Sequence, residues 1–508
     1  MVFLTLLNAM LLPAGAVTVT VKTSGSTTPV SPYIYGSNES DWAASGKYLT
    51  LGRQGGNRMT AYNWENNASN AGSDWYNQND DFLGGGATAG EVPRAATAAA
   101  LKAGKAALVT IPMAGYVAAD KNGGGDVNQT PDYLNVRFRV SRPRKGTKFV
   151  YPPSLSDGYV YQDEFVSWLE KTFKSRSSST PIFYSLDNEP DLWAFTHSRI
   201  HPDKATYVEM VDKTTALATA IKAVASKATI FGFVSYGYNG YKSLQDAPDA
   251  QGRDFINYYL DSMKLADKHA GKRLLDVLDL HWYSEAQGGG QRITGNDVSP
   301  ASVAARVQAP RSLWDASYTE DSWIAQYVTN GPIHLIPTLR SQIAAHYPGT
   351  KLGFTEYNYG ASNHISGAVA QADALGIFGR EGVFAACYWP LGGDNSFVHG
   401  AFDAFRNYDG KGARFGDAEL VATSSRISDV TVYASKAVSG GGYVVVLINK
   451  ATDATPVAVN LDAKLKSIKA YSLAGSNPHM VLANLGTVSG KVANLTLPGM
   501  SVNTVLLK

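Results

Sequence analysis

The chain has little cysteine, little net charge and no long apolar run beyond its N-terminus. Cys387 is the single cysteine, which excludes an intrachain disulfide and a cluster of cysteine metal ligands. Lys and Arg number 45 against 43 Asp and Glu, and this net charge of +2 offers little attraction to nucleic acid or to an anionic membrane. No internal stretch approaches the roughly 18 apolar residues of a membrane helix. We therefore expect no nucleic-acid partner and no membrane association.

Aromatic side chains are abundant, with 28 Tyr, 18 Phe and 9 Trp among 508 residues. Hydrophobic residues make up 44% of the chain and charged residues 17%, so a large core can be buried and a disordered chain is excluded. The aromatic residues fit two interpretations: a large core, or a surface that stacks against flat, uncharged, hydroxylated ligands.

Residues 31–415 alternate short, apolar, β-rich runs with longer segments of helical spacing. The runs lie at 33–37, 49–62, 106–116, 181–189, 229–236, 276–283, 351–357 and 383–390, and helical segments lie at 161–173, 204–225, 255–266, 333–345 and 366–378. Eight such alternations predict a (β/α)8 TIM barrel, in which ligands bind at the carboxyl ends of the strands. Long loops rich in Gly, Asn and Asp, at 66–92 and 288–299, follow two of the runs and suit that end.

From residue 416 the pattern changes to short strand-like runs separated by Gly, Asn and Asp turns. The runs lie at 430–434, 443–449, 457–461, 467–473 and 501–507, and they predict a β-sandwich domain over 416–508. They contain Tyr but no Trp, which favours packing against the barrel over binding a polysaccharide.

The N-terminal segment, residues 1–30, holds two features. Residues 1–16 are mostly apolar and end in Ala14-Gly15-Ala16, which is typical of a short export signal, although the usual basic residues are absent. We therefore expect a secreted, extracellular protein. The run 17–23 alternates like the C-terminal strands, so we expect it to join the β-sandwich.

Two glutamates come at the ends of opposite barrel strands. The fourth run ends in Asp187-Asn188-Glu189-Pro190, and the seventh contains Thr355-Glu356-Tyr357. Two carboxylates that face each other over the barrel mouth are the equipment for hydrolysing a glycosidic bond, one as an acid and one as an ionised group. Alternatively, Glu189 caps the next helix and Glu356 is a salt-bridged barrel residue.

Residues around this pair supply further parts of such a site. Asn188 could bind a sugar 2-hydroxyl, and Arg58, leaving the second strand, could keep a carboxylate ionised. His281 could hold polar groups at the mouth, Tyr283 could donate to the nucleophile, and Trp389 could form the floor under a sugar ring. A core histidine and a core tryptophan are the alternatives for His281 and Trp389.

Tryptophans placed by this pattern predict a groove that binds a polymer. Trp64, Trp75 and Trp193 lie in or beside the loops after strands two and four, and Trp282 and Trp389 lie at strand ends. Sugar rings expose apolar C–H faces that stack on aromatic rings. The other candidates, Trp168, Trp314 and Trp323, are expected to be packing residues.

Five segments of the chain resemble glycoside hydrolase family 44: residues 56–67, 186–190, 273–277, 279–283 and 355–357. The resemblance covers almost the whole chain. It implies a retaining endo-β-1,4-glucanase with a barrel and a β-sandwich, acting on cellulose-like glucans and in some members on xyloglucan or xylan. It also implies Glu189 as acid/base and Glu356 as nucleophile. The predicted substrate-binding residues are Arg58, Trp64, Asn188, Trp193, His281, Trp282, Tyr283, Tyr357 and Trp389.

The resemblance further implies a structural calcium, with no cofactor for catalysis. The loop after strand two offers oxygen donors from Glu65, Asp74, Asp80 and Asp81, of which Glu65, Asp74 and Asp80 are the predicted ligands. Ca²⁺ takes six to eight oxygens, and no EF-hand spacing is present. Solvated loop acids are the alternative.

We thus expect a monomeric enzyme that cuts internal β-1,4 bonds, with the charge of Glu356 raising the pKa of Glu189. A xylanase or an exo-acting β-glycosidase of similar architecture is one alternative. A non-catalytic carbohydrate-binding protein is the other.

Overall fold

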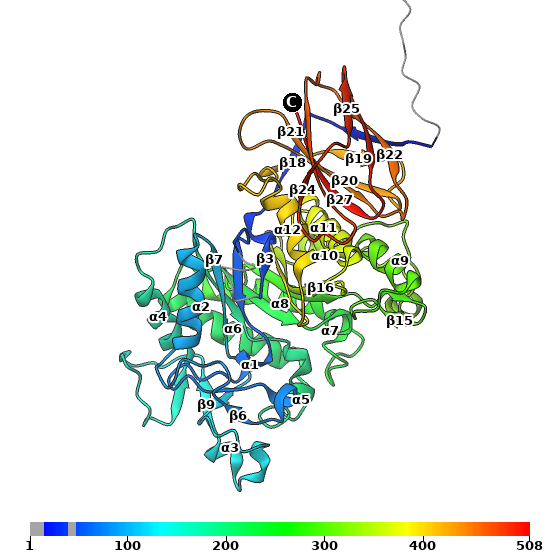
Figure 1. The fold of residues 1–508 in the computed structure, drawn as a ribbon. Coiled ribbons are helices and arrows are strands. Elements are labelled where there is room, and N and C mark those ends of the chain that lie inside the picture. Colours follow the sequence, from blue (N-terminus) through cyan, green and yellow to red (C-terminus); the bar gives the residue numbers. More distant parts are fainter. Residues whose placement is uncertain (1–14, 39–46) are drawn as a thin grey trace, which may run out of the picture.

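The computed structural model describes residues 15–38 and 47–508 (Figure 1). The export signal expected at 1–16 lies outside these residues apart from Gly15 and Ala16. Among the described residues, no helix has the length and apolar character needed to cross a membrane.

A closed barrel of eight strands forms the larger part of the molecule. Its strands, in chain order, are β3 (Gly36–Ser37), β4 (Leu51–Gln54), β7 (Ala106–Ile111), β11 (Ile182–Leu186), β12 (Ile230–Ser235), β13 (Val277–Tyr283), β16 (Lys351–Asn358) and β17 (Ala385–Tyr388). Each pairs in parallel with its neighbours, and β17 closes the ring onto β3. The predicted barrel is confirmed, because each of the eight runs contains one of these strands.

Helices pack around the outside of the barrel (Figure 1). The longer ones are α2 (Glu91–Lys102), α4 (Gln162–Thr172), α6 (Tyr207–Val224), α8 (Phe255–Ala270), α9 (Pro300–Gln308), α10 (Leu335–His346), α11 (Ile365–Arg380) and α12 (Ser396–Arg406). Four short ones are α1 (Asn57–Thr60), α3 (Tyr133–Val136), α5 (Trp193–Thr196) and α7 (Tyr238–Ser243). The five predicted helical segments correspond to α4, α6, α8, α10 and α11. Side-chain caps fix some helix starts: Thr206 accepts from the N–H of Glu209 in α6, and Asp254 from that of Asn257 in α8.

The second strand is shorter than its run. β4 ends at Gln54, where Gly55 and Gly56 follow and Gly56 takes a φ of 82° that favours glycine. Helix α1 begins directly afterwards at Asn57. Arg53 is therefore a strand residue that points into the barrel, whereas Arg58 lies on a helix.

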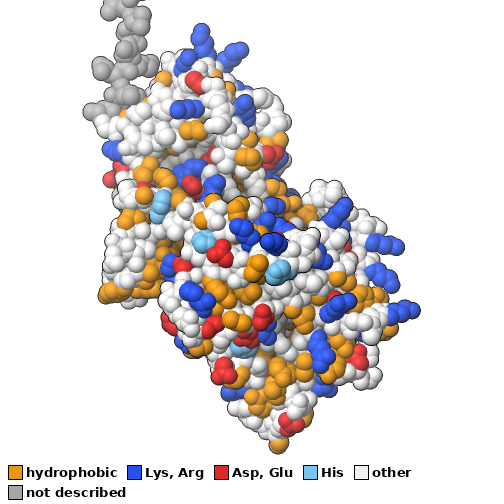
Figure 2. All heavy atoms as spheres, turned by 180° about the vertical axis from the view of Figure 1, so that it is seen from behind, with side chains coloured by type: hydrophobic (Ala, Val, Ile, Leu, Met, Phe, Trp, Pro, Cys, Tyr) orange, Lys and Arg blue, Asp and Glu red, His pale blue; other side chains and the backbone are white. Residues whose placement is uncertain are grey.

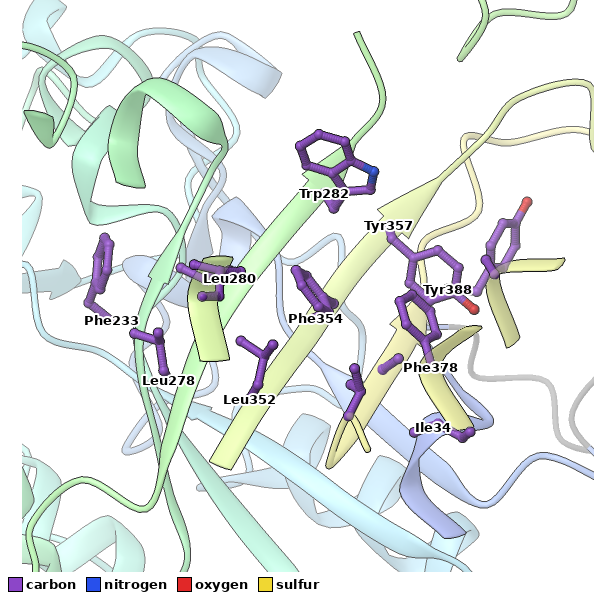
Figure 3. Packing of buried hydrophobic residues seen from close by; sticks show 14 of the residues in the cluster. Ile34, Phe233, Leu278, Leu280, Trp282, Leu352, Phe354, Tyr357, Phe378 and Tyr388 are labelled. Carbon is purple, nitrogen blue, oxygen red and sulfur yellow. The ribbon is translucent and has the colours of Figure 1, made fainter. Parts of the chain in front are cut away.

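The strands bury both of their faces. Val277 of β13 joins Leu108, Phe231 and Cys387 in a cluster inside the barrel. Its neighbours Leu278, Leu280 and Trp282 belong to the larger core around the barrel, together with Leu352, Phe354 and Tyr357 of β16 (Figure 3). Side chains of a strand alternate between its two faces, so this pattern fixes which residues can reach the barrel mouth.

Two sheets, antiparallel except for the pair β1 and β22, form the smaller lobe. One has the order β19-β1-β22-β26-β25 and the other β2-β18-β20-β21-β27-β23-β24. Their strands are β1 (Val17–Val21), β2 (Thr27–Pro29), β18 (Ala418–Leu420), β19 (Ala422–Ser424), β20 (Val430–Lys436), β21 (Tyr443–Asn449), β22 (Thr455–Leu461), β23 (Ile468–Ala474), β24 (Val481–Ala483), β25 (Gly486–Ser489), β26 (Val492–Leu497) and β27 (Ser501–Leu507). The N-terminal strand β1 pairs with β19 and, in parallel, with β22, so it joins the sandwich as expected. The strands that the sequence did not indicate are β2, β18, β19, β24, β25 and β26.

Small two- or three-stranded ribbons complete the structure on the loops. These strands are β5 (Ser69–Asn70), β6 (Asn79–Asp80), β8 (Tyr116–Ala118), β9 (Phe138–Arg142), β10 (Tyr159–Tyr161), β14 (Gln287–Gly288) and β15 (Gln291–Arg292). On the face shown in Figure 2, basic, acidic and apolar side chains are interspersed over both lobes, in keeping with the small net charge.

A buried polar cluster ties the sandwich to the barrel. Asp373 of α11 lies 2.6 Å from Lys450 Nζ, and both side chains are fully buried. The same carboxylate accepts hydrogen bonds from Thr431 and Tyr433 of β20 at 2.6 and 2.7 Å. The sandwich is thus packed against the barrel through specific contacts.

Candidate active site

A cavity of about 300 Å³ lies at the carboxyl ends of the barrel strands. Its lining comprises Gly56, Asn57, Asp74, Asn188, Glu189, Tyr236, Tyr283, Arg292, Thr294, Glu356, Trp389 and Leu391. A second cavity of about 400 Å³ shares Tyr236, Tyr283 and Arg292 with it and continues past Tyr238 and Trp323. Together they form a groove rather than a single closed pocket.

The two predicted glutamates meet in the first cavity. A carboxylate oxygen of Glu189, one of Glu356 and a ring nitrogen of His281 all lie within 4.8 Å of one another. Glu189 follows β11 and Glu356 lies in β16, as their positions at the ends of the fourth and seventh barrel strands require. The two carboxylates are too close together for a water molecule to fit between one of them and a sugar bound in the cavity.

The backbone around Glu189 is strained and firmly held. Asp187 and Glu189 have φ values of 65° and 45°, in the left-handed region that non-glycine residues rarely adopt. The carboxylate of Asp187 accepts hydrogen bonds from Thr60 Oγ1, from Trp193 Nε1 and from the backbone N–H groups of Met113, Ala114 and Asn188. The N–H of Glu189 donates to the carbonyl of Val234 at 2.9 Å. These bonds hold the acid in place against the strain.

Glu356 receives two strong donors. Arg53 Nη1 lies 2.6 Å from its Oε1 in an ion pair almost excluded from solvent, and Tyr283 donates to Oε2 at 2.7 Å. Arg53 also donates through Nη2 to Asn188 Oδ1 at 2.8 Å. The two bonds hold the carboxylate in one orientation, and the predicted role of Tyr283 agrees with its hydrogen bond.

The role predicted for Arg58 is wrong, and Arg53 takes its place. Arg58 pairs with Asp80 at 2.5 Å and lies over the ring of Phe82, away from both glutamates. The prediction failed because strand two ends before residue 58. A charged side chain inside a buried strand needs a partner, and this was the signal that could have identified Arg53.

Burial sets the protonation of Glu189. It raises the pKa of this carboxyl to about 8, with a smaller contribution from Asp74 in the same direction, while Arg53 opposes it. We expected the charge of Glu356 to raise the pKa of Glu189, but desolvation of the Glu189 carboxyl raises it instead. Glu189 is a carboxylic acid at neutral pH.

His281 is a neutral partner of that acid. Its Nδ1 lies 2.8 Å from Glu189 Oε1, and burial lowers its pKa to about 3. The ring is fully buried beneath the cavity, so His281 orients polar groups at the mouth rather than lining it.

Trp389 lies at the end of β17 and lines the cavity, as predicted. Its ring rests against Gly56, where a Cβ would stand 2.6 Å from the ring carbon Cη2. Because Gly56 has no side chain, there is room for the ring of Trp389. Asn188 lines the same cavity.

Three other predicted substrate contacts are fully buried. Trp64 stacks on Phe165 at 5.5 Å, Trp193 bonds Asp187, and Tyr357 accepts from Gln371 and packs on Phe378. Their side chains are fully buried, so these three predictions are wrong. Trp282 and Tyr357 alternate with inward-pointing neighbours and face the helices (Figure 3).

Trp282 borders the second cavity with only 1% of its surface exposed. Trp75, beside the lining residue Asp74, is 47% exposed. The structure also adds lining residues that the sequence did not indicate: Tyr236, Arg292 and Trp323. Trp323 was expected to be a packing residue.

The predicted calcium ligands do not form one site. Asp74 accepts from Asn57 in the cavity, Asp80 pairs with Arg58, and burial raises the pKa of Glu65 to about 8. Within the described residues, the three potential metal ligands that converge are Glu189, His281 and Glu356, which belong to the cavity.

Known proteins resemble this chain over most of its length. The model of glycoside hydrolase family 44 matches residues 68–286. Endoglucanase A of Paenibacillus lautus is 47% identical over 440 residues, which are 83% of this chain and 62% of that protein. Beta-mannanase/endoglucanase A of Caldicellulosiruptor saccharolyticus is 41% identical over 517 residues, or 95% of this chain and 38% of that protein. The chain thus spans less than two thirds of both of these relatives.

A solved structure shows the likeness over the whole length. The xyloglucanase from family 44 of Paenibacillus polymyxa, solved with xyloglucan, superposes with a TM-score of 0.92. It is 41% identical to this chain, and the match covers 97% of this chain and 99% of that one. The chain therefore belongs to glycoside hydrolase family 44.

Proposed function

We propose that the protein is a retaining endo-β-1,4-glucanase that hydrolyses internal bonds of cellulose-like glucans. The observation that carries the proposal is the pair Glu189 and Glu356, whose oxygens approach within 4.8 Å in one cavity. Their environments differ: Glu189 is neutral by burial, and Glu356 receives an arginine and a tyrosine donor. Close carboxyls with opposite protonation are the equipment of a double displacement.

In the first step, Glu356 attacks the anomeric carbon while Glu189 gives its proton to the glycosidic oxygen. The C–O bond breaks, the leaving sugar departs as an alcohol, and an ester to Glu356 forms. Arg53 and Tyr283 hold the attacking carboxylate in one orientation.

In the second step, the ionised Glu189 takes a proton from a water molecule that attacks the same carbon. The ester bond breaks, Glu356 is released as a carboxylate, and the sugar keeps its original configuration. Glu189 ends protonated, ready for the next cycle.

The shape of the site favours internal cleavage of a polymer. The groove continues from the catalytic cavity past Tyr236 to Tyr238 and Trp323, whose rings can stack on sugars. The proposal that β-1,4-linked backbones are the substrates is supported by relatives named for endoglucanase, β-mannanase and xyloglucanase activities. We rank unbranched β-1,4-glucan first, xyloglucan second, and mannan and xylan after them. The enzyme would meet such polymers outside the cell.

A polymer panel tests the proposal. Carboxymethylcellulose should lose viscosity early, while reducing ends rise slowly, and E356Q should abolish both signals. Early monosaccharide release without a viscosity drop would instead identify an exo-acting enzyme, and xylan cleaved in preference to all glucans would identify a xylanase. Binding of polymer without any release of reducing sugar would leave a carbohydrate-binding protein.

A further inference from the structure

Asp279 is a buried carboxylate beneath the active site that the double displacement does not use. It lies on β13, fully buried, and does not line either cavity of the groove. Its Oδ1 accepts from the backbone N–H of Thr355 at 3.2 Å, and its Oδ2 accepts from the hydroxyl of Thr355 at 2.9 Å. Both oxygens are therefore directed at one residue of the neighbouring strand.

A shift in strand pairing makes this contact possible. Leu280 pairs with Phe354 and His281 pairs with Glu356, so Thr355 is an extra residue in β16. A bulge of this kind turns a side chain that would otherwise face the helices. The hydroxyl of Thr355 and the carboxylate of Glu356 consequently both reach the barrel interior.

Hydrogen bonds connect Asp279 to the catalytic acid. Thr355 Oγ1 lies 3.4 Å from His281 Nε2, and His281 Nδ1 lies 2.8 Å from Glu189 Oε1. A threonine hydroxyl has one proton, and the shorter bond gives it to Asp279. The oxygen can then only accept from His281, so the proton of the neutral ring belongs on Nε2 and Nδ1 is left as an acceptor.

We infer that Asp279 and Thr355 are positioning residues that hold His281 as its Nε2–H tautomer, so that Nδ1 accepts the proton of Glu189. The inference rests on the proposed function, in which Glu189 is the acid. Neither residue touches the substrate. They act through His281 on the protonation state of Glu189, which does contact the substrate.

The chain of bonds has only two self-consistent directions. In one, Glu189 carries the proton and Asp279 is ionised; in the other, every bond reverses and Asp279 carries it. Burial raises the pKa of both carboxyls, so one proton is retained between them; the backbone N–H of Thr355 donates to Asp279 and favours its ionised form, which leaves the proton on Glu189. Other groups act along the chain. Arg53, Glu356, Cys387 and Tyr241 act on Asp279, and Arg53, Asp74, Asp191, Tyr236, Tyr241 and Tyr283 act on Glu189. Arg53 and Glu356 also act on His281, whose Nδ1 lies 3.5 Å from Glu356 Oε2 as well as 2.8 Å from Glu189.

The variant D279N tests the inference through pH dependence. An asparagine amide can donate to Thr355 Oγ1, which turns the hydroxyl toward His281 and shifts the ring proton to Nδ1. The ring then donates to Glu189 and favours its ionised form. The alkaline limb of kcat/KM should move down by about one pH unit, with KM unchanged. D276N is the matched control, since Asp276 bonds Lys222 and the N–H of Ile230 outside this chain of bonds.

If D279N does not fold, a pair of variants at Thr355 tests the same inference. T355V keeps the shape but removes the hydroxyl, and it should shift the same limb. T355S keeps the hydroxyl and should show the wild-type dependence of kcat/KM on pH. Equal loss of kcat at every pH, with unmoved limbs in D279N and T355V, would overturn the inference.

Nitrogen NMR of histidine-labelled protein reads the tautomer without any activity assay. The His281 signals are identified by their absence from H281N. They should show a protonated Nε2 and a bare Nδ1 in the wild type, and the reverse in D279N. A wild-type ring protonated on Nδ1 would refute the inference, whereas the predicted tautomer in a protein inactive on every polymer would refute only the proposed function.

Discussion

Arg53 and Glu356 form an ion pair of 2.6 Å that is almost closed to solvent, and the same guanidinium binds Asn188 next to the acid. One side chain therefore fixes Glu356, the proposed nucleophile, relative to the strand end that carries Glu189. Arginine suits this role because its planar fork can bind two acceptors at once in fixed directions.

Replacing Arg53 should harm catalysis far more than replacing Arg58. R53K keeps the charge but cannot reach both Glu356 and Asn188, so kcat should fall about 100-fold or more. R58K disturbs contacts with Asp80, Ser69 and Phe82 that lie away from both glutamates, and it should change kcat less than about threefold. Steady-state kinetics on carboxymethylcellulose checks both, with circular dichroism to confirm folding. A comparable loss in R58K would contradict the assignment.

Removing the acid should discriminate between leaving groups. E189A should lose most activity on polymers, whose sugar leaving groups need a proton, and retain much more on activated aryl glycosides. Azide should rescue its second step, because a small anionic nucleophile needs no general base. Equal losses on both substrate types would show that Glu189 has another role.

The pKa of Glu189 predicts an alkaline limb. The acid form is needed in the first step, so kcat/KM on polymers should fall about tenfold per pH unit above pH 8. Aryl glycosides with good leaving groups should not show this limb. A limb near pH 5 on polymers would disprove the protonated resting state.

The same shift predicts a change in stability. The carboxyl has an ordinary pKa of 4.5 and one of about 8 when folded, so between these pH values the folded state binds the proton and the unfolded chain does not. The free energy of unfolding therefore falls as pH rises through this window. E189Q removes this effect, and thermal unfolding should find its advantage over the wild type larger at pH 8 than at pH 5.

Much of the architecture could be predicted because hydrophobic alternation is local. Eight apolar runs correspond to eight barrel strands, and the Glu189 and Glu356 positions at strand ends followed from that count. The predicted substrate contacts that were wrong are side chains that the fold buries. Trp64 lies in a turn and Trp193 begins the short helix α5; both rings are fully buried, and nothing in such short segments shows which aromatic ring turns inward.

Other features depend on details that alternation does not encode. The end of β4 at Gln54 decided between Arg53 and Arg58, and the extra residue Thr355 is visible only in strand pairing. The predicted calcium ligands are neighbours in sequence, but their carboxylates separate because Asp80 turns to Arg58 and Asp74 turns to the cavity.

The cluster between barrel and sandwich should matter for stability alone. D373A leaves the buried ammonium of Lys450 unpaired and should cost about 3–5 kcal/mol of unfolding free energy. The double variant D373L/K450M should recover much of that loss. Denaturant unfolding measures both, and kcat should remain near the wild-type value. A D373A protein as stable as the wild type would show that the pair is not needed.

The strand β1 lies between β19 and β22, with Val17 paired to Val457. Its partner strands are synthesised only after the entire barrel. The nascent chain therefore carries β1 unpaired, with Val17, Val19 and Val21 exposed, during most of translation. Such edges recruit other chains. Expression should therefore be sensitive to translation rate and temperature, and cutting the chain between barrel and sandwich should give two insoluble pieces rather than a minimal enzyme.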